Sequence, residues 1–148
     1  MDLTTSNPLA HVQPTIEQIM ELQQAIGELP QVELPLFHHF TDHAYARELH
    51  IPAGVAIVGK MHRTHHFLIV ASGHISVTTG EGQEDVIGPK VIITTPGTKR
   101  AIYAHTDAVL ITCHVTDETD LDKIEAAVIM PDPVLPGAEP LALEEDSP

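Results

Sequence analysis

Short apolar runs separated by glycine or proline fill the middle of the chain, from about residue 36 to residue 115. Strands of this length at such close spacing, with no helix between them, are typical of an antiparallel barrel or sandwich. Gly80, Glu81 and Gly82 stand between two of the runs and predict a hairpin turn. The runs are AYARELHI, VAIV, HFLIVAS, ISVTT, DVIG, VIITT, RAIYA and AVLITCHV.

Helical signals flank this region on both sides. Thr15 and Gln18 have the spacing of a capping box, in which the Thr15 hydroxyl accepts from the third amide and Gln18 reaches back to the cap. Apolar residues then recur at helical spacing up to Gly27, a residue suited to a left-handed helix end, so we predict a helix over residues 16–26. Farther along, Thr119 can cap a second short helix that begins with acidic residues.

The sequence therefore predicts an all-β protein with a helix before its barrel and a short helix after it. We divide the chain into an N-terminal helical arm (1–34), a barrel (35–116) and a C-terminal helix with an acidic, proline-rich tail (117–148). Residues 1–14 and 131–148 carry no apolar periodicity. We therefore expect the barrel to fold without these two ends.

The formal net charge of −14 is concentrated in the flanks of the chain. Residues 1–34 contain five acids and no lysine or arginine, and residues 117–148 contain ten acids and one lysine. Residues 35–116 are balanced, with six acids and six bases, and hold ten of the eleven histidines. Because no basic stripe is present to neutralise phosphates, we expect no nucleic-acid partner.

Other features of the sequence indicate where the protein is found. No apolar run approaches the length of about 18 residues that a membrane helix needs, and the N-terminus lacks the pattern of a secretory signal. The single cysteine, Cys113, excludes an internal disulfide and suits a reducing compartment. We expect a soluble, cytoplasmic protein with no membrane partner, in which Cys113 is a buried small hydrophobe that faces away from its neighbour His114.

The stretch GKMHRTHHFLIVASG, residues 59–73, resembles the first motif of the cupin superfamily. That motif has two histidines, a glutamate, and a glycine seven positions after the glutamate. Gly73 matches the closing glycine and His62 matches the second histidine. Lys60 and His66 stand where the motif has its first histidine and its glutamate.

A second cupin motif, a glycine followed by Pro-x-Gly and a histidine, is echoed farther along. Gly88 and the pair Pro96-Gly97 match it, but Arg100 or Ala101 takes the position of the histidine. The resemblance implies a cupin-type double-stranded β-helix, which is a jelly-roll barrel.

The cupin resemblance covers about residues 40–116. More narrowly, the runs HRTHHFLIVASGHISV, PGTKRAIYAH and TCHVTDETDLDKIE resemble small cupin-domain proteins encoded by tailed bacteriophages. This narrower resemblance implies a phage protein that is found in the cytoplasm of the host cell or in the virion.

The cupin resemblance also implies where a metal would bind. In the cupin arrangement the strand that starts at His66 points this side chain into the barrel, and His62 lies beside it at the barrel mouth. Two imidazoles there can hold Fe, Mn, Ni or Zn if another strand supplies a third ligand. The candidate third ligand is His114, and His105 is held in reserve.

Strand parity leaves the position of His114 open. One of the two alternating sets of residues in AVLITCHV is slightly more apolar than the other, namely Val109, Ile111, Cys113 and Val115. If this set faces the core, His114 lies outside the barrel. The alternative to a metal site is an empty barrel rimmed by polar residues, with no cofactor. Three of the four ligands of the motif are changed, which favours this alternative.

The remaining candidates have simpler interpretations. We expect Lys99 and Arg100 to be a solvated pair, and Glu48 is the one suggestion for a general base. The other histidines of the barrel are expected at the surface or at an interface, namely His38, His39, His43, His50, His65 and His74.

Two functions follow from these interpretations. The first, which the changed metal motif favours, is a non-catalytic structural or interaction module in a phage particle or another assembly. The second is a small metal-dependent isomerase, epimerase or dioxygenase that uses His62, His66 and His114. Apolar residues at both parities of HFLIVA and AVLITC also predict a homo-oligomer, most simply a dimer, and contacts with other protein subunits.

Overall fold

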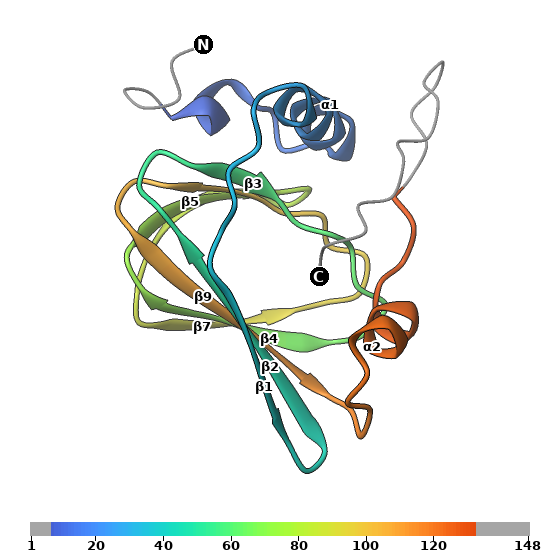
Figure 1. Cartoon of the computed structure of the whole chain (residues 1–148). Helices are drawn as coiled ribbons and strands as arrows, with labels where there is room; N and C mark the ends of the chain where they lie inside the picture. Colours follow the sequence, from blue (N-terminus) through green and yellow to red (C-terminus); the bar gives the residue numbers. More distant parts are fainter. Residues whose placement is uncertain (1–6, 133–148) are drawn as a thin grey trace.

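The computed structural model describes residues 7–132, apart from the side chain of His11. Two antiparallel sheets face each other and enclose a barrel (Figure 1). The five-stranded sheet has the order β1-β2-β9-β4-β7, and the four-stranded sheet has the order β3-β8-β5-β6. This confirms the predicted all-β cupin-type barrel with a helix before it and a short helix after it, while residues 133–148 of the predicted acidic tail lie outside the described residues.

The elements follow the runs of the sequence closely. The strands are β1 (Leu36–Thr41), β2 (Ala44–Ile51), β3 (Ala56–Val58), β4 (His66–Ser72), β5 (His74–Thr79), β6 (Gly82–Ile87), β7 (Lys90–Thr94), β8 (Ala101–Ala104) and β9 (Ala108–Val115). The helices are the 3-10 turn η1 (Pro8–His11), α1 (Ile16–Gly27) and α2 (Leu121–Val128). The predicted hairpin turn joins β5 to β6, where Thr79 pairs with Gly82. Neither α-helix of the described chain is long and apolar enough to cross a membrane.

The hydrophobic core fills one half of the barrel. Alternate residues of both sheets point inward there, as the period of two in the strands requires. The buried core residues are Leu49, Ile51, Leu68, Val70, Ile75, Val77, Val86, Ile102, Ala104, Ala108 and Leu110. The other half of the barrel holds polar side chains, which are described below.

Helix α1 begins as predicted but ends differently. The Thr15 hydroxyl accepts a hydrogen bond from the backbone N–H of Gln18 at 3.2 Å. The side chain of Gln18 bonds Glu21 instead of reaching back to the cap, so the reciprocal half of the capping box is wrong. The left-handed end is also wrong, because Gly27 lies within the helix and Glu28 follows it as a cap with φ of −86°.

The N-terminal segment packs on the outer face of the four-stranded sheet, together with α1. Leu9 is 1% exposed and shares an apolar cluster with Ile19 and Tyr103. The side-chain amide of Gln83 donates to the carbonyls of Leu9 and Val12, both at 2.7 Å. Residues 7–14 therefore belong to the folded unit, and folding of the barrel without residues 1–14 stays a prediction.

Helix α2 closes the polar end of the barrel. Asp120 caps it by accepting from the amides of Asp122 and Lys123, so Thr119 is not the cap. Ile124 and Val128 pack against the buried ring of Tyr45. The helix and the residues directly after it therefore pack on their own barrel.

Candidate functional site

The three histidines predicted as metal ligands meet inside the polar half of the barrel. His62 precedes β4, His66 opens β4, and His114 lies near the end of β9. Their ring centroids are 4.3 Å apart for His62 and His66, 4.7 Å for His66 and His114, and 5.1 Å for His62 and His114. Three segments that are distant in the sequence thus bring three imidazoles together.

The structure places His114, whose position strand parity left open, inside the barrel. This histidine is only 5% exposed and faces the interior, whereas Val115 faces outward and is 91% exposed. The slightly more apolar side of β9 is the outer side, where Val109, Ile111 and Cys113 are half-buried and Val115 is exposed. Hydrophobicity of a strand face therefore did not identify the inside of this barrel.

Burial keeps all three imidazoles neutral. Burial, followed by the effects of the neighbouring His66 and His114, lowers the pKa of His62 to about 3. Burial, followed by the effect of His66, lowers the pKa of His114 to about 4. Burial also lowers the pKa of His66, against the effect of its hydrogen bond to the Thr64 carbonyl at 3.2 Å. Neutral imidazole is the form that binds a metal ion.

Two arginines add positive charge around the histidines. Arg47 lies on β2 and Arg100 directly precedes β8, and burial lowers the pKa of both. One terminal nitrogen of Arg100 donates to the Thr94 hydroxyl at 3.1 Å. The Nε atoms of both arginines and Nδ1 of His114 are buried without a hydrogen-bond partner within the described residues.

The fit of these residues to a metal ion is therefore mixed. The donor types suit a first-row divalent metal. The rings of His62 and His114 stack, with 24° between their planes. Among the residues 7–132, three ligand atoms come within 4.8 Å of one another only in a different group, described below, so the nitrogens of the three barrel histidines do not converge in this way. The rings would have to turn before one ion could be bound, against the charge of Arg47 and Arg100.

The other candidates occupy different places. His105, the reserve ligand, lies on the four-stranded sheet beside His74 and Asp85, so it cannot complete the barrel site. Glu48 points to the outer face of the five-stranded sheet, where it bonds His39 and His50, and it cannot act as a base inside the barrel.

Lysines predicted near the site are paired. Lys60 forms an ion pair with Glu125 of α2 at 2.7 Å. Lys99 is 2% exposed and pairs with Asp132 at 2.7 Å, which corrects the expectation that Lys99 and Arg100 are solvated. These contacts hold residues 125–132 over the barrel end.

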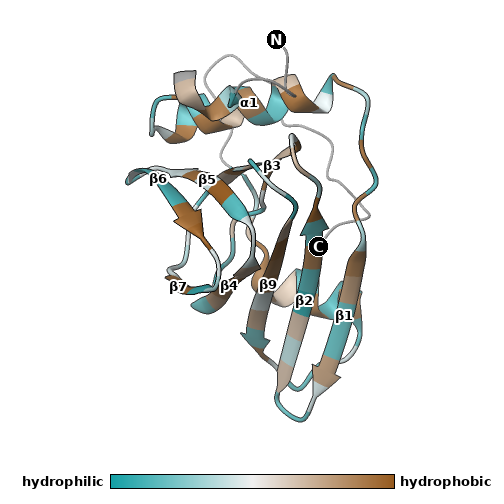
Figure 2. Cartoon of the chain, turned by 90° about the vertical axis from the view of Figure 1, so that its left-hand side faces the viewer, coloured by the Kyte–Doolittle hydropathy of each residue, from teal (hydrophilic) through white to brown (hydrophobic). Residues whose placement is uncertain are grey.

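The outer face of the five-stranded sheet is a second feature of functional interest. The strand register places Phe67 beside Cys113 of β9 and beside Ile93 of β7. Phe67 is 49% exposed and Ile93 is 67% exposed, and Cys113 is half-buried at this surface rather than in the core as expected. Figure 2 shows brown, apolar segments along β1 and β9, two of the strands that form this face. The sequence predicted apolar residues on both faces of these strands, but it did not predict which face would be exposed to solvent.

Comparison with known proteins identifies the fold alone. No protein-family model matches the sequence, and no curated protein matches it. Among solved structures, KdgF from Halomonas sp. matches with a TM-score of 0.51 and 14% identity, over 64% of this chain and 90% of that one.

Two further solved structures are named as cupins. A cupin superfamily protein from Desulfitobacterium hafniense matches with a TM-score of 0.49 and 12% identity, over 79% of this chain and 97% of that one. The Cnp3 cupin domain of Schizosaccharomyces pombe matches with a TM-score of 0.49 and 19% identity, over 69% of this chain and 78% of that one. The two facing antiparallel sheets and the match to KdgF at a TM-score of 0.51 support the cupin-type fold that the sequence predicts.

Proposed function

We propose that this chain is a non-catalytic interaction module with the cupin fold, and that it binds a second copy of itself. The binding surface is the outer face of the five-stranded sheet, which we call the apolar sheet face. One observation carries the proposal: large apolar side chains on this face are 49 to 91% exposed. Exposed apolar patches of this kind usually mark protein interfaces. The exposed members are Phe37, Phe67, Val91, Ile93 and Val115.

The low charge of this face permits a second copy as its occupant. The chain carries a net charge of −14, so most pairings of two copies would be opposed by repulsion. On the apolar sheet face the strands present one acid, Glu48, whose carboxylate contacts His39 at 2.9 Å and His50 at 2.6 Å. Two such faces can approach with little like-charge repulsion.

The size of the face is adequate for a modest dimer. The five strands have 5 to 8 residues each, so with four spacings of about 4.8 Å and a mean strand length of roughly 22 Å the face covers about 420 Å². Two copies would bury roughly 850 Å², which is the size of a weak, reversible interface. Stacking of two sheets about 10 Å apart is a common arrangement in β proteins, and a two-fold axis makes one patch serve both copies.

The double variant Phe67→Asp, Ile93→Asp tests this proposal. We expect it to weaken dimerisation at least a hundredfold, because stacking would bury two unpaired carboxylates in each copy. Sedimentation equilibrium of the wild type should show a reversible dimer of the 16.1 kDa chain, and the variant should be a monomer. Ile87→Asp is the matched control, since Ile87 is 70% exposed but belongs to the other sheet. A wild type that is monomeric at micromolar concentration, or a dimer that survives the double variant, would contradict the proposal.

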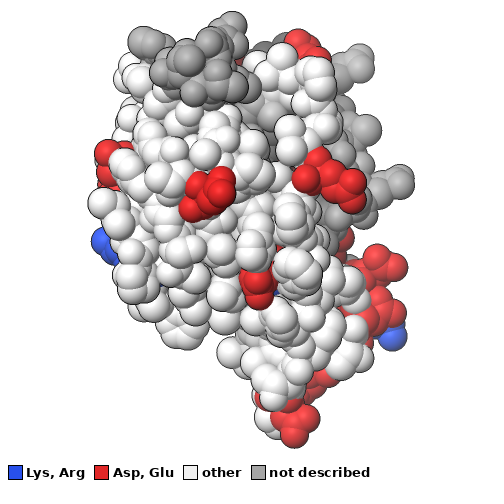
Figure 3. Space-filling view, turned by 60° about the vertical axis from the view of Figure 1, so that its left-hand side comes forward, with Lys and Arg blue, Asp and Glu red and all other residues white. Residues whose placement is uncertain are grey.

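The proposal also includes other protein subunits as partners. An assembly role in a phage particle rests on the resemblance of the sequence to small phage cupins. Nucleic acid is not proposed as a partner: on the face drawn in Figure 3, acidic side chains lie in several groups, and Lys and Arg are nearly absent.

A second candidate function is a metal-dependent enzyme with its site at His62, His66 and His114. Two observations favour it: the three imidazoles gather at one end of the barrel, and Nδ1 of the buried His114 has no partner among the described residues. A bound ion would stabilise the folded state by mass action, about 2.7 kcal/mol at a hundredfold excess over its dissociation constant.

Chelation separates this candidate from the first. If the barrel binds a metal, a chelator should lower the melting temperature by several degrees, and His62→Ala with His66→Ala should remove this sensitivity. We expect no effect of the double variant on chelator sensitivity, because the rings stack and two arginines lie beside them. Stoichiometric metal that survives dialysis and is lost in the double variant would establish the second candidate instead.

A further inference from the structure

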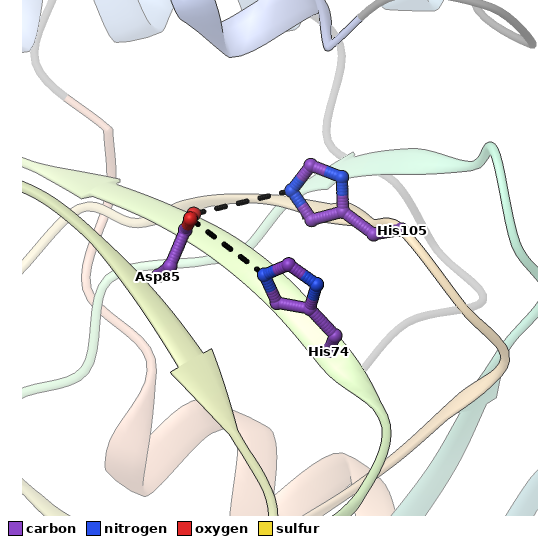
Figure 4. A group of neighbouring side chains, drawn as sticks. All are labelled: His74, Asp85 and His105. Atoms are coloured by element: carbon purple, nitrogen blue, oxygen red, sulfur yellow. Dashed lines mark ion pairs between the residues drawn. The ribbon is translucent and has the colours of Figure 1, made fainter.

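A second group of metal-binding side chains lies on the outer face of the four-stranded sheet, away from the barrel interior. His74 begins β5, Asp85 is on β6, and His105 directly follows β8. One ligand atom from each of these side chains lies within 4.8 Å of the other two (Figure 4). Nε2 of His74 is 3.6 Å from one oxygen of Asp85, and Nε2 of His105 is 3.9 Å from the other oxygen.

The backbone holds the two histidines side by side. The N–H of His105 donates to the carbonyl of His74 at 2.9 Å, and the N–H of His74 donates to the Thr106 hydroxyl at 2.9 Å. Their rings stack with centroids 4.3 Å apart and 26° between planes. Both ligands therefore stand on adjacent strands, and little conformational entropy would be lost when they bind an ion.

Ser76 connects the two sides of the group. Its hydroxyl donates to Asp85 at 2.7 Å, contacts Nε2 of His105 at 2.6 Å, and accepts from the side-chain amide of Asn7 at 3.1 Å. Ser76 is 7% exposed and its neighbour Tyr103 packs edge-on against His105. The hydrogen bond from Ser76 orients Asp85, whereas the contact between Ser76 and Nε2 of His105 would be replaced by the ion when this nitrogen binds it.

We propose that His74, Asp85 and His105 bind one first-row divalent metal ion, with Zn²⁺ as the best match. Two imidazoles and a carboxylate are ligands that Zn²⁺ takes at about 2.0–2.2 Å, which separates ligand atoms in a tetrahedral site by about 3.4 Å. The separations of 3.6 and 3.9 Å approach this value, so small side-chain rotations suffice. Asp85 and the two rings are partly open to solvent, which leaves a path for the ion and for water as the fourth ligand.

The bound ion would cross-link three segments of this sheet. It would join β6, the strand at the edge of the four-stranded sheet, to β5 and β8. Through Ser76 and Asn7 it would also support the N-terminal segment that packs on the same face. The ion is therefore expected to protect this sheet and the N-terminal segment from opening, independently of self-association through the opposite sheet.

Titration of the full-length, chelator-stripped protein with ZnCl₂ tests the proposal, by calorimetry and with Co²⁺ as a visible-absorption probe. We expect one ion per chain with a dissociation constant below about 10 μM, and a melting temperature raised by several degrees. The variant His74→Ala with His105→Ala should weaken binding at least a hundredfold, and Asp85→Asn about tenfold. Circular dichroism of each variant without metal checks that it is folded.

The barrel variant His62→Ala with His66→Ala is the matched control, since it also removes two neighbouring imidazoles. It should retain the affinity of the wild type. The proposal is overturned if the wild type binds Zn²⁺ no more tightly than about 10 μM. It is also overturned if the barrel variant loses the ion while the His74 and His105 variant keeps it.

Discussion

Lowering the pH from 7 to 5 is expected to destabilise the metal-free protein by about 4 kcal/mol, roughly 2 kcal/mol for each of two buried histidines. His62 and His114 have folded-state pKa values of about 3 and about 4, well below the ordinary value of 6.5. Between these values the unfolded chain takes up protons that the folded chain does not. The stability that the two neutral histidines contribute is therefore fully present above pH 6.5 and is lost as the pH falls toward 4. A loss of this size is a large part of the stability of a typical domain.

Urea denaturation at several pH values measures this effect. The double variant His62→Gln, His114→Gln removes both titrating groups, so the dependence of its unfolding free energy on pH should be much shallower between pH 7 and 5. His65→Gln, at an exposed position, should behave as the wild type. Equal slopes in the wild type and the double variant would show that these histidines are not kept neutral by burial.

The substitution Gly73→Ala is expected to destabilise the fold by about 3–5 kcal/mol. Gly73 links β4 to β5 with φ of +97°, a conformation that residues with a Cβ rarely adopt. A Cβ there would lie 2.5 Å from the carbonyl oxygen of Asp107 and 2.7 Å from Cα of Ala108. Both are backbone atoms at the start of β9, so neither can move aside without displacing the strand.

Gly80→Ala is the matched control for Gly73→Ala. No atom lies within 4 Å of the position that a Cβ would take at Gly80, and this glycine is not among those with positive φ. We expect its urea midpoint to stay close to that of the wild type, within about 0.5 kcal/mol. A loss at Gly80 as large as that at Gly73 would mean that the close approach of backbone atoms is not the cause.

The fold could be predicted because the closing glycine of the first cupin motif is required by the conformation of the backbone. The glycine that closes the first motif, Gly73, stands where only glycine fits, and the runs of alternating residues define strands whatever their partners are. The helix start at Thr15 is a local interaction and was also predicted. The end of α1 and the start of α2 were predicted less well. In each case a neighbouring residue takes the predicted place: Glu28 follows Gly27 as the cap of α1, and Asp120 replaces Thr119 as the cap of α2.

The candidate sites could be predicted only in part. His62 and His66 are close in sequence, so the motif places them together, whereas His114 depends on which face of β9 is inside. That face could not be read from hydrophobicity because the outer face is also apolar. The group of His74, Asp85 and His105 was missed, since it needs the pairing of β5 with both β6 and β8. The one signal available was that His74 and His105 each stand at a predicted strand end.

The reactivity of Cys113 tests self-association through the apolar sheet face most directly. It is the one cysteine of the sequence, it is half-buried, and it lies beside Phe67 on that face. Burial raises the pKa of its thiol, so reaction with a chromogenic disulfide should be followed at a fixed alkaline pH. We expect the rate constant to fall at least tenfold as the protein concentration rises from about 0.1 to 100 μM, because the dimer covers the thiol. A rate constant that stays the same over this range, in a sample shown to be dimeric, would place the interface elsewhere and contradict the proposal.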